Sequence, residues 1–200
     1  MSFDRIARVY RWLEYAAYGR ELERRRFRYL AEVADAKRAL LLGDGDGRFL
    51  ARLVAQNRAL RADAVDASAR MLELARERAG EDRVTYRHFD ALEFPLPRAE
   101  YDLIVAHFFL DCLDQRGVET LVRRVSEAAR PGARWLISEF REPRWARLYL
   151  RGLYLFFRVT AGLKNQRLVD HRPVLARYGF RLTEEETSRA GLLASELWEL

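Results

Sequence analysis

Short apolar runs of strand length alternate with amphipathic stretches of helix length along this chain. Such alternation is typical of a layered α/β fold, in which helices connect the strands of a mainly parallel sheet. The chain has 200 residues, and one domain usually takes roughly 100 to 200 residues. Because no repeat, low-complexity tract or linker rich in Pro, Gly or Ser divides the sequence, we expect one domain with helices on both faces of one sheet.

The hydrophobic period predicts where each element lies. The expected helices are 3–33, Arg48–Gln56, Ala69–Ala79, Gln115–Ala129, Arg144–Leu163 and a short helix that ends at Tyr178 and Gly179. The expected strands are Ala39–Leu42, a strand that ends near Asp66, Val84–Phe89, a strand from Tyr101, Arg134–Glu139, Arg181–Glu186 and Leu193–Leu200. Pro131 and Gly132 form a breaker pair, so we expect the helix before them to stop there. The last two strands, joined by a short loop, predict an antiparallel pair at the sheet edge.

Charge and composition argue against several classes of protein. The net charge is +6, but the arginines alternate with Glu and Asp along the expected helices, which is typical of a solvated face rather than a nucleic-acid surface. One cysteine, Cys112, rules out an internal disulfide, and three scattered histidines give no metal-ligand spacing. No signal peptide and no run of about 18 apolar residues is present, so we expect a cytoplasmic protein.

The stretch LLLGDGDGRF, residues 40–49, carries three glycines directly after an expected strand. Glycines at this density bring the backbone close to a ligand. A dinucleotide fingerprint needs a third glycine where this chain has Arg48, and a P-loop needs Gly-Lys followed by Ser or Thr, which is absent. The remaining pattern, G-x-G-x-G at Gly43, Gly45 and Gly47, predicts a turn that approaches a ligand without cradling phosphates.

Two acidic residues follow the next two expected strands. Asp66 lies 19 residues beyond Gly47, in AVDAS, and Asp90 lies in HFDAL. The carboxyl ends of parallel strands meet at one sheet edge, where an acid can accept both hydroxyls of a ribose. The glycine turn, Asp66 and Asp90 are therefore expected to converge on one nucleoside.

These motifs, in this order, resemble those of the class I S-adenosylmethionine-dependent methyltransferases over about residues 36–140. The resemblance implies a Rossmann-like sheet of seven mainly parallel strands with a reversed last strand. It also implies that the glycine turn binds the methionine part of the cofactor, that Asp66 binds ribose and that Asp90 lies beside adenine. The residues it assigns to S-adenosylmethionine, with S-adenosylhomocysteine as product, are Tyr10, Gly43, Asp44, Gly45, Gly47, Asp66, Ala67, Met71, Asp90, Ala91 and His107.

The opening FDRIARVYRWLEYAAYG looks like the N-terminal helix of the ubiquinone/menaquinone biosynthesis methyltransferases, in which a tyrosine at the place of Tyr10 helps to close the cofactor pocket. The chain departs from the family twice. Leu41 stands where the family usually has an acid, and Arg11 stands where this subgroup usually has aspartate. Asp44 and Asp46, inside the turn, are the candidates to replace the missing carboxylate.

Methyl transfer is an in-line displacement in which positioning alone supplies much of the acceleration. His107, at the end of the fourth strand, is the best-placed candidate base for an acceptor that must lose a proton, because imidazole titrates near working pH. A histidine with apolar sequence neighbours is more often a hydrogen-bonded structural residue, so both interpretations stay open. Weaker candidates for the base are Asp111, Glu139 and His171.

The segment 144–163 carries a basic stripe on an otherwise apolar and aromatic helix. The stripe consists of Arg144, Arg147, Arg151 and Arg158. Such a helix is suited to a membrane interface, with its arginines toward lipid phosphates. The alternative is a helix that packs between the sheet and the N-terminal segment with its arginines in water.

The sequence thus predicts a methyltransferase with a small, hydrophobic or aromatic acceptor and no metal, either monomeric or homodimeric, with nucleic acid not expected as a partner. The expected parts are a helical lid (1–35), a cofactor core (36–140), an acceptor-side helical insertion (141–179) and two final strands (180–200). One alternative is a cofactor-binding regulatory or assembly protein without transfer activity, which Leu41 would favour. Another is a Rossmann-type oxidoreductase, which Arg48 opposes.

Overall fold

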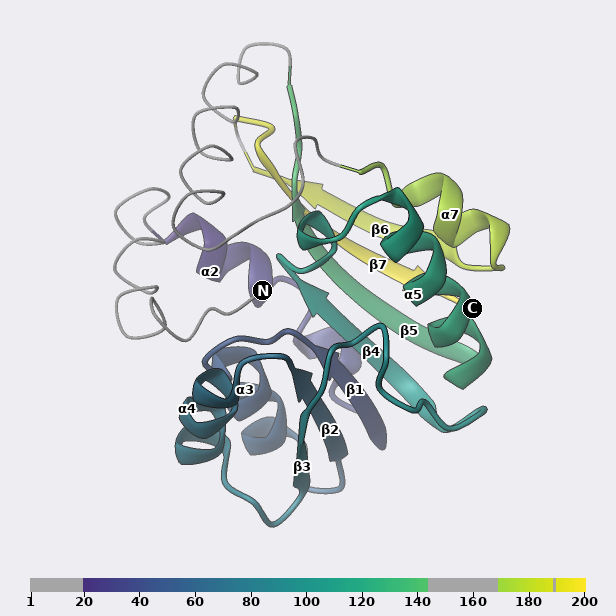
Figure 1. The fold of residues 1–200 in the computed structure, drawn as a ribbon. Helices are drawn as coiled ribbons and strands as arrows, with labels where there is room; N and C mark the ends of the chain where they lie inside the picture. The colour runs from purple at the N-terminus through teal and green to yellow at the C-terminus, as the bar shows by residue number, and fades with distance from the viewer. Residues whose placement is uncertain (1–19, 144–168, 189) are drawn as a thin grey trace.

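The computed structural model describes residues 20–143, 169–188 and 190–200. They form one seven-stranded sheet in the order β3-β2-β1-β4-β5-β7-β6 (Figure 1). The strands are β1 (Arg38–Leu42), β2 (Arg61–Asp66), β3 (Val84–His88), β4 (Tyr101–His107), β5 (Ala129–Phe140), β6 (Arg181–Thr187) and β7 (Leu193–Glu199). The helices are α2 (Glu21–Arg26), α3 (Arg48–Gln56), α4 (Ala69–Ala79), α5 (Gln115–Ala128) and α7 (Arg172–Arg177), with 3₁₀ turns η1 (Ala31–Val33) and η2 (Leu110–Cys112).

The sheet is parallel from β3 to β5, and β7 runs antiparallel to both of its neighbours, β5 and β6. This confirms the predicted mainly parallel sheet with a reversed last strand. In such a sheet the carboxyl ends of β1 to β5 all lie at one edge, which is where ligands bind in open α/β folds. The candidate site residues that the structure describes lie at this edge, at the ends of β1, β2, β3 and β4 or just after them.

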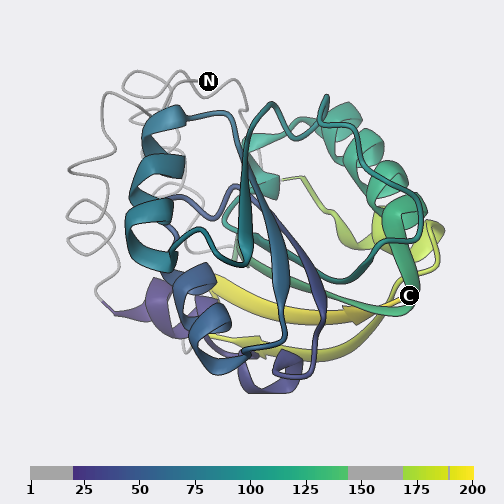
Figure 2. The same ribbon diagram turned by 90° about the horizontal axis from the view of Figure 1, so that it is seen from below.

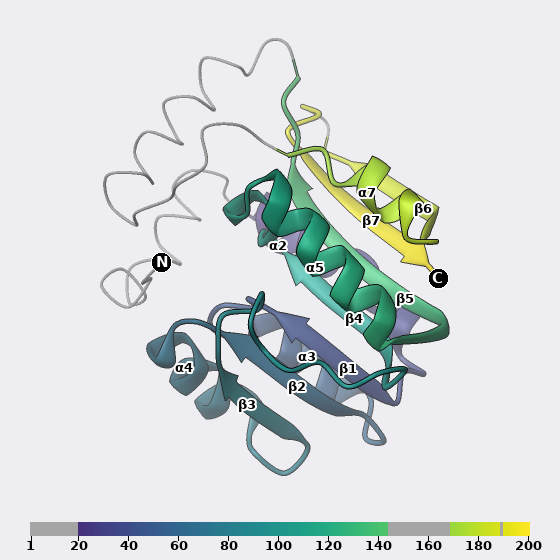
Figure 3. The same ribbon diagram turned by 45° about the vertical axis from the view of Figure 1, so that its right-hand side comes forward.

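Helices cover both faces of the sheet, as predicted. In Figure 2, α2, α3 and α4 lie on one side of the strands, and α5 and α7 lie on the other. Figure 3 shows α5 lying along β4 and β5. Each face has its own apolar cluster: Leu103 and Val105 of β4 point to the α3 side, whereas Ile104 and Ala106 point to the α5 side. The inner strands β1, β2 and β4 are buried on both faces, as in other parallel sheets, whereas the edge strands β3 and β6 are largely exposed.

Side-chain caps explain where α4 and α5 begin. Ser68 accepts a hydrogen bond from the backbone N–H of Met71 at 3.2 Å, and Asp114 accepts one from that of Gly117 at 2.7 Å. These caps satisfy backbone donors that the first turn of a helix leaves unpaired. The predicted bounds of α3 and α4 are confirmed.

Two predicted boundaries are wrong by more than two residues. The helical stretch predicted to continue to residue 33 ends at Arg26, because the chain turns there and buries Tyr29 and Val33 against the α3 face of the sheet. The strand predicted from Arg134 begins at Ala129 instead. Ala129 pairs with Tyr101 across an irregular stretch in which Gly132 takes a left-handed φ of +76°, so Pro131 and Gly132 lie inside the extended segment.

Some predictions lie outside the described residues. They include Tyr10, the first part of the N-terminal helix and the basic stripe of 144–163. Within the described ranges, no helix combines the length and the apolar character that crossing a membrane requires.

Candidate cofactor site

The glycine turn connects β1 to α3, and all three of its glycines have positive φ. The values are +63° at Gly43, +62° at Gly45 and +76° at Gly47, a range that favours glycine. A Cβ at Gly43 would lie 2.3 Å from the ring of Phe109, and one at Gly47 would lie 2.6 Å from Cα of Ala75. At Gly45, no atom of the described residues lies within 4 Å of such a Cβ. Gly43 and Gly47 are therefore packed against neighbouring residues, with no room for a side chain. Gly45 has room beside it among the described residues, so a ligand can approach its backbone.

Asp44 lies half-buried in this turn. Its Oδ2 accepts a hydrogen bond from the backbone N–H of Leu50 in α3, at 3.1 Å. Its Oδ1 is also buried, and no residue in 20–143, 169–188 or 190–200 donates to it. Burial raises the pKa of Asp44 to about 7, although the positive charge of Arg26 opposes the shift. An oxygen in this state is suited to a cationic donor of a ligand, because a buried polar atom is stabilised by a partner.

Asp46 and Leu41 do not offer such an oxygen. Asp46 forms ion pairs with Arg48 at 2.8 Å and with Arg78 at 2.7 Å. Burial by itself raises the pKa of Asp46, but these two arginines outweigh it and hold the pKa below its usual value. Leu41 is fully buried in the apolar cluster on the α3 face. Of the two carboxylates expected to replace the acid missing at Leu41, Asp44 is the better candidate.

The ends of β1, β2 and β3 lie side by side, as predicted. The backbone N–H of Gly43 donates to the carbonyl of Val65 at 2.9 Å, and that of Phe89 donates to the carbonyl of Asp66 at 3.2 Å. Asp66 itself is half-buried, and its Oδ1 accepts from the N–H of Ser68 at 2.8 Å. This contact fixes the direction of the Asp66 carboxylate at the mouth of the turn.

The residues that follow Asp66 and β3 differ in exposure. Ala67 and Asp90 are exposed, whereas Met71 and Ala91 are buried. The Oδ1 of Asp90 accepts from the N–H of Leu92 at 2.9 Å, which stabilises the loop after β3.

Phe89, which precedes Asp90, is 46% exposed, and its ring lies 5.6 Å from that of Phe94. An exposed aromatic face beside a strand-end acid is suited to a planar base.

His107 lies at the end of β4 with its side chain toward the α2 and α3 face. Its Nδ1 is 2.9 Å from Oγ of Ser138, and its ring packs edge-on against Phe49 at 4.6 Å. It is only 4% exposed, and burial, together with the charge of Arg26, lowers its pKa well below the usual value. Its Nε2 has no hydrogen-bond partner within the part of the chain that the structure describes. Of the two interpretations open for His107, these contacts favour the structural one.

Beyond His107, the chain bends sharply into η2. Phe108 takes a φ of +54°, which is uncommon for a residue with a side chain and is stored strain of the kind found at functional sites. Its ring lies 5.4 Å from that of Phe140 at the end of β5. This bend places Phe109 against Gly43, so the ends of β1, β4 and β5 are in contact.

Glu139 projects from β5 to the opposite face from Ser138, because successive side chains of a strand alternate. Its Oε1 accepts from the N–H groups of Phe109 and Leu110, at 3.0 and 2.7 Å. Glu139 also lines a pocket of about 200 Å³ at this end of the sheet. The residues that line the pocket are Asp111, Glu139, Phe140, Arg141, Glu142, Val169, Asp170 and His171. The sequence named Asp111, Glu139 and His171 only as weak candidates, and the structure brings all three to one pocket.

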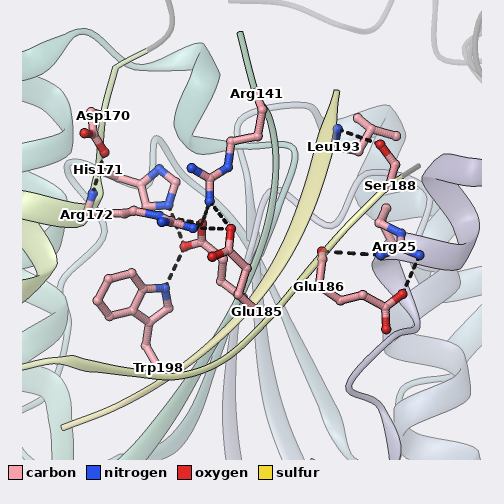
Figure 4. Close-up of polar contacts among 11 residues, drawn as sticks. Arg25, Arg141, Asp170, His171, Arg172, Glu185, Glu186, Ser188, Leu193 and Trp198 are labelled. Carbon is pink, nitrogen blue, oxygen red and sulfur yellow. Dashed lines mark hydrogen bonds and ion pairs between the residues drawn. The ribbon is translucent and has the colours of Figure 1, made fainter. Parts of the chain in front are cut away.

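A polar cluster borders the same pocket and was not predicted. The buried carboxylate of Glu196 accepts from His171 at 2.9 Å, from Arg141 at 2.7 Å and from Trp198 at 2.8 Å, and it also accepts from Arg172. Figure 4 shows these four donors converging from β5, β7 and the start of α7. The cluster fixes His171 and Arg141 in the pocket wall. Glu196 is a single glutamate in a strand of alternating polar and apolar residues, and that pattern does not predict a buried polar cluster.

Similarity to known proteins agrees with this geometry. A family model described as a methyltransferase domain matches residues 39–132. A demethylmenaquinone methyltransferase of Clavibacter sepedonicus is 34% identical over 137 residues, which are 67% of this chain and 53% of that protein. These similarities identify residues 39–132 as a methyltransferase domain of the S-adenosylmethionine-dependent type. The resemblance and the seven-stranded fold predicted from the sequence are confirmed.

A second curated relative is the ubiquinone/menaquinone biosynthesis C-methyltransferase UbiE of Rubrivivax gelatinosus. It is 29% identical over 139 residues, which are 70% of this chain and 52% of the relative. The chain therefore spans about half the length of the curated relatives it matches.

Solved structures show the same fold at low sequence identity. An S-adenosylmethionine-dependent methyltransferase from Mesorhizobium loti has a TM-score of 0.67 and 21% identity, over 82% of this chain and 90% of that one. The N-methyltransferase NodS from Bradyrhizobium japonicum, in complex with S-adenosyl-L-homocysteine, has a TM-score of 0.68 and 17% identity, over 89% and 87%.

Proposed function

We propose that this methyltransferase-family chain binds S-adenosylmethionine at the glycine turn and transfers its methyl group to a small hydrophobic or aromatic acceptor. The observation that carries the proposal is the open space at Gly45. The same turn holds Oδ1 of Asp44, which has no donor among the described residues, and Asp66 ends the neighbouring strand β2. In this arrangement a ligand can approach the backbone at Gly45, a cation can bind at Asp44, and hydroxyl groups can bind at Asp66. S-adenosylmethionine has groups for all three, because it joins an amino acid to a nucleoside.

The described residues fit the parts of the cofactor as follows. Asp44 would hold the amino group of the methionine part, because its buried Oδ1 is suited to a cation. Asp66 would accept the ribose hydroxyls, since its Oδ1 already has a fixed direction. Phe89 and Asp90 would border the adenine ring, with Met71 and Ala91 beneath it. Tyr10 remains a prediction for closing this pocket.

S-adenosylmethionine supplies a methyl group that a positively charged sulfur makes reactive. The role of the chain is then to hold the acceptor in line with that methyl group and to exclude water, which supplies much of the acceleration. Phe109, packed on Gly43, would separate the cofactor from the acceptor side. His107 would stabilise the end of β4 through its contacts with Ser138 and Phe49, rather than touch the acceptor.

The proposed acceptor class is supported by the curated relatives, whose names describe methylation in menaquinone and ubiquinone biosynthesis. The pocket beside Glu139 also has aromatic and apolar walls at Phe140 and Val169. The alternative, a binding protein without transfer activity, rested on Leu41. Asp44 removes most of that support, because it supplies a carboxylate at the same turn.

The membrane contact predicted for 144–163 and the location in the cytoplasm stay predictions. Co-sedimentation with anionic liposomes at low and high salt tests the contact, since an electrostatic attachment weakens as salt rises. The choice between monomer and homodimer needs a measurement of mass in solution.

The experiment for the proposed function is a transfer assay with methyl-labelled S-adenosylmethionine and a panel of quinols, phenols and lipids. We expect label in at least one aromatic acceptor, and less label with Asp66→Ala at a cofactor concentration below saturation. Cofactor binding without transfer to any member of the panel would favour the non-enzymatic alternative.

A further inference from the structure

The pocket at the end of β5 is lined by a buried carboxyl group, of which only one oxygen accepts hydrogen bonds from the described residues. Glu139 is 3% exposed. Its Oε1 accepts two backbone hydrogen bonds, from Phe109 and Leu110. Its Oε2 is equally buried but has no hydrogen-bond partner among the residues that the structure describes. A buried carboxylate oxygen without a donor is costly, so such groups in a pocket wall are candidates for ligand contact.

The other charged groups around Glu139 do not supply the missing donor. Arg141 donates to Glu185 and Glu196, and the Nε2 of His171 is paired with Glu196. Besides burial, the groups that raise the pKa of Glu139 are the carboxylates of Asp111 on η2 and Glu196 on β7, both negative. Further charged groups that line the same pocket are Glu142 and Asp170. The immediate surroundings of Oε2 therefore favour an incoming hydrogen-bond donor and disfavour an anion.

Phe109 connects Glu139, in the wall of this pocket, to the glycine turn. Phe109, whose N–H donates to Glu139, is the residue whose ring packs against Gly43. Phe109 therefore contacts both Glu139 and the turn that we assign to the cofactor. The volume of about 200 Å³ has room for one end of a small molecule rather than for the whole of a large one.

From this geometry we propose that Oε2 of Glu139 receives the hydrogen bond of the acceptor's nucleophilic O–H or N–H group and takes its proton during methyl transfer. This proposal rests on the proposed function. For a hydroxyl acceptor, the O–H bond breaks and its proton passes to the Glu139 carboxylate. The oxygen forms a bond to the methyl carbon, and the electron pair of the breaking C–S bond stays on sulfur, which becomes a neutral thioether.

The electrostatic surroundings support a base at this place. Burial, and then the negative charge of Asp111, raise the pKa of Glu139 well above its usual value, although the two backbone N–H groups oppose the shift. Burial likewise raises the pKa of Asp111 to about 6. A base whose pKa lies nearer to the working pH accepts a proton from a weakly acidic O–H or N–H more readily than an ordinary carboxylate does.

The test uses naphthol and its methyl ether, methoxynaphthalene, as matched probes that differ in one hydrogen-bond donor. Binding of each probe is measured by NMR in the presence of S-adenosylhomocysteine, over a pH series from about 7 to 9 that increases the carboxylate form. Wild type should bind naphthol about tenfold more tightly than the ether, since one hydrogen bond to a charged acceptor has that effect. Naphthylamine, in a parallel arm, distinguishes an N–H from an O–H donor.

Glu139→Gln is the decisive variant, because its amide oxygen can still accept from Phe109 and Leu110 while the second position loses its charge. The preference for naphthol should fall to nearly none, with the thermal midpoint and the affinity for S-adenosylhomocysteine close to wild type. Glu127→Gln, an exposed charge removal on α5, should keep the preference. Equal binding of the two probes by wild type, or an unchanged preference in Glu139→Gln, would overturn the role of Glu139. Failure of S-adenosylhomocysteine to bind wild type would instead count against the proposed function.

Discussion

The side chain of Asp44 accepts a hydrogen bond from the backbone N–H of Leu50 at 3.1 Å, across the turn that joins β1 to α3. This contact fixes one carboxylate oxygen near the start of a helix and leaves the other buried, with no donor from the described residues. The turn thereby contains the acid that the strand before it lacks, since Leu41 belongs to the apolar core.

Asp44→Asn should weaken the binding of S-adenosylhomocysteine by about 1 to 3 kcal/mol, because a charged partner for the ligand's amino group is lost. The amide oxygen can still accept from Leu50, so the thermal midpoint should change little. Isothermal titration calorimetry measures the affinity, and Asp46→Asn is the matched control in the same turn. A larger loss of affinity in the Asp46 variant would mean that the wrong carboxylate has been assigned.

For folding, ionisation of Asp44 has the opposite effect from binding. Its pKa is raised to about 7, so ionisation lowers the free energy of unfolding as pH rises from about 4 to 7.

Cofactor affinity should also depend on pH through Asp44. A cationic ligand favours the ionised form of Asp44, so binding should release protons and strengthen as pH rises from about 6 to 8. Calorimetry in buffers of different ionisation enthalpy detects the protons. A pH-independent affinity in wild type would argue against an ion pair with Asp44.

Gly45 and Gly47 should respond differently to alanine. Gly45→Ala adds a Cβ in open space, so stability should fall only by the cost of a positive φ, about 1 kcal/mol, while cofactor affinity drops sharply. Gly47→Ala places its Cβ 2.6 Å from Cα of Ala75, so the main effect should be loss of stability. Thermal unfolding with and without S-adenosylhomocysteine separates the two effects. If Gly45→Ala binds normally, the open space at Gly45 is not the cofactor site.

His107→Ala should lower the free energy of unfolding by about 2 to 5 kcal/mol, because it removes a buried ring that packs on Phe49. The depressed pKa of His107 means that its contribution is complete above pH of about 6.5 and is lost as pH falls below that value. Urea unfolding at pH values on either side of this range measures both. A stable His107→Ala protein that binds cofactor but has lost turnover would restore His107 as the candidate base.

Glu196→Ala should destabilise the protein by about 3 to 5 kcal/mol, since it leaves several buried donors without their acceptor. Burial raises the pKa of Glu196, but the hydrogen bonds from His171 and Trp198 and the charge of Arg172 hold it below its usual value. Its contribution is therefore present above pH of about 4.5 and is lost as pH falls below that. Chemical denaturation across this range is the measurement, and a loss under about 1 kcal/mol would show that the cluster is not a structural anchor.

The elements that local sequence determines were predicted well. The ranges Arg48–Gln56 and Ala69–Ala79 agree with the structure because their period is helical and because Ser68 caps the second of them. The predicted start of β5, at Arg134, is wrong because Ala129 pairs with Tyr101, although Pro131 and Gly132 usually interrupt a strand. Pairing between distant segments cannot be read from the local pattern.

The same limit applies to the site. Asp66 and Asp90 could be placed from the sequence, because the carboxyl ends of parallel strands must share an edge. The pocket around Glu139 could not, because it depends on how η2 folds back and on where the chain before α7 passes. The opposite directions of His107 and Glu139 follow from the register of β4 with β5, which only the structure reveals.

The most direct test is calorimetric titration of the purified protein with S-adenosylmethionine and with S-adenosylhomocysteine, with NAD as the control ligand. We expect micromolar binding of the first two and no detectable binding of NAD, because Gly45 approaches a ligand and Arg48 takes the place of the glycine that a dinucleotide needs. Absence of binding by either adenosyl compound would contradict the assignment of the glycine turn as the cofactor site.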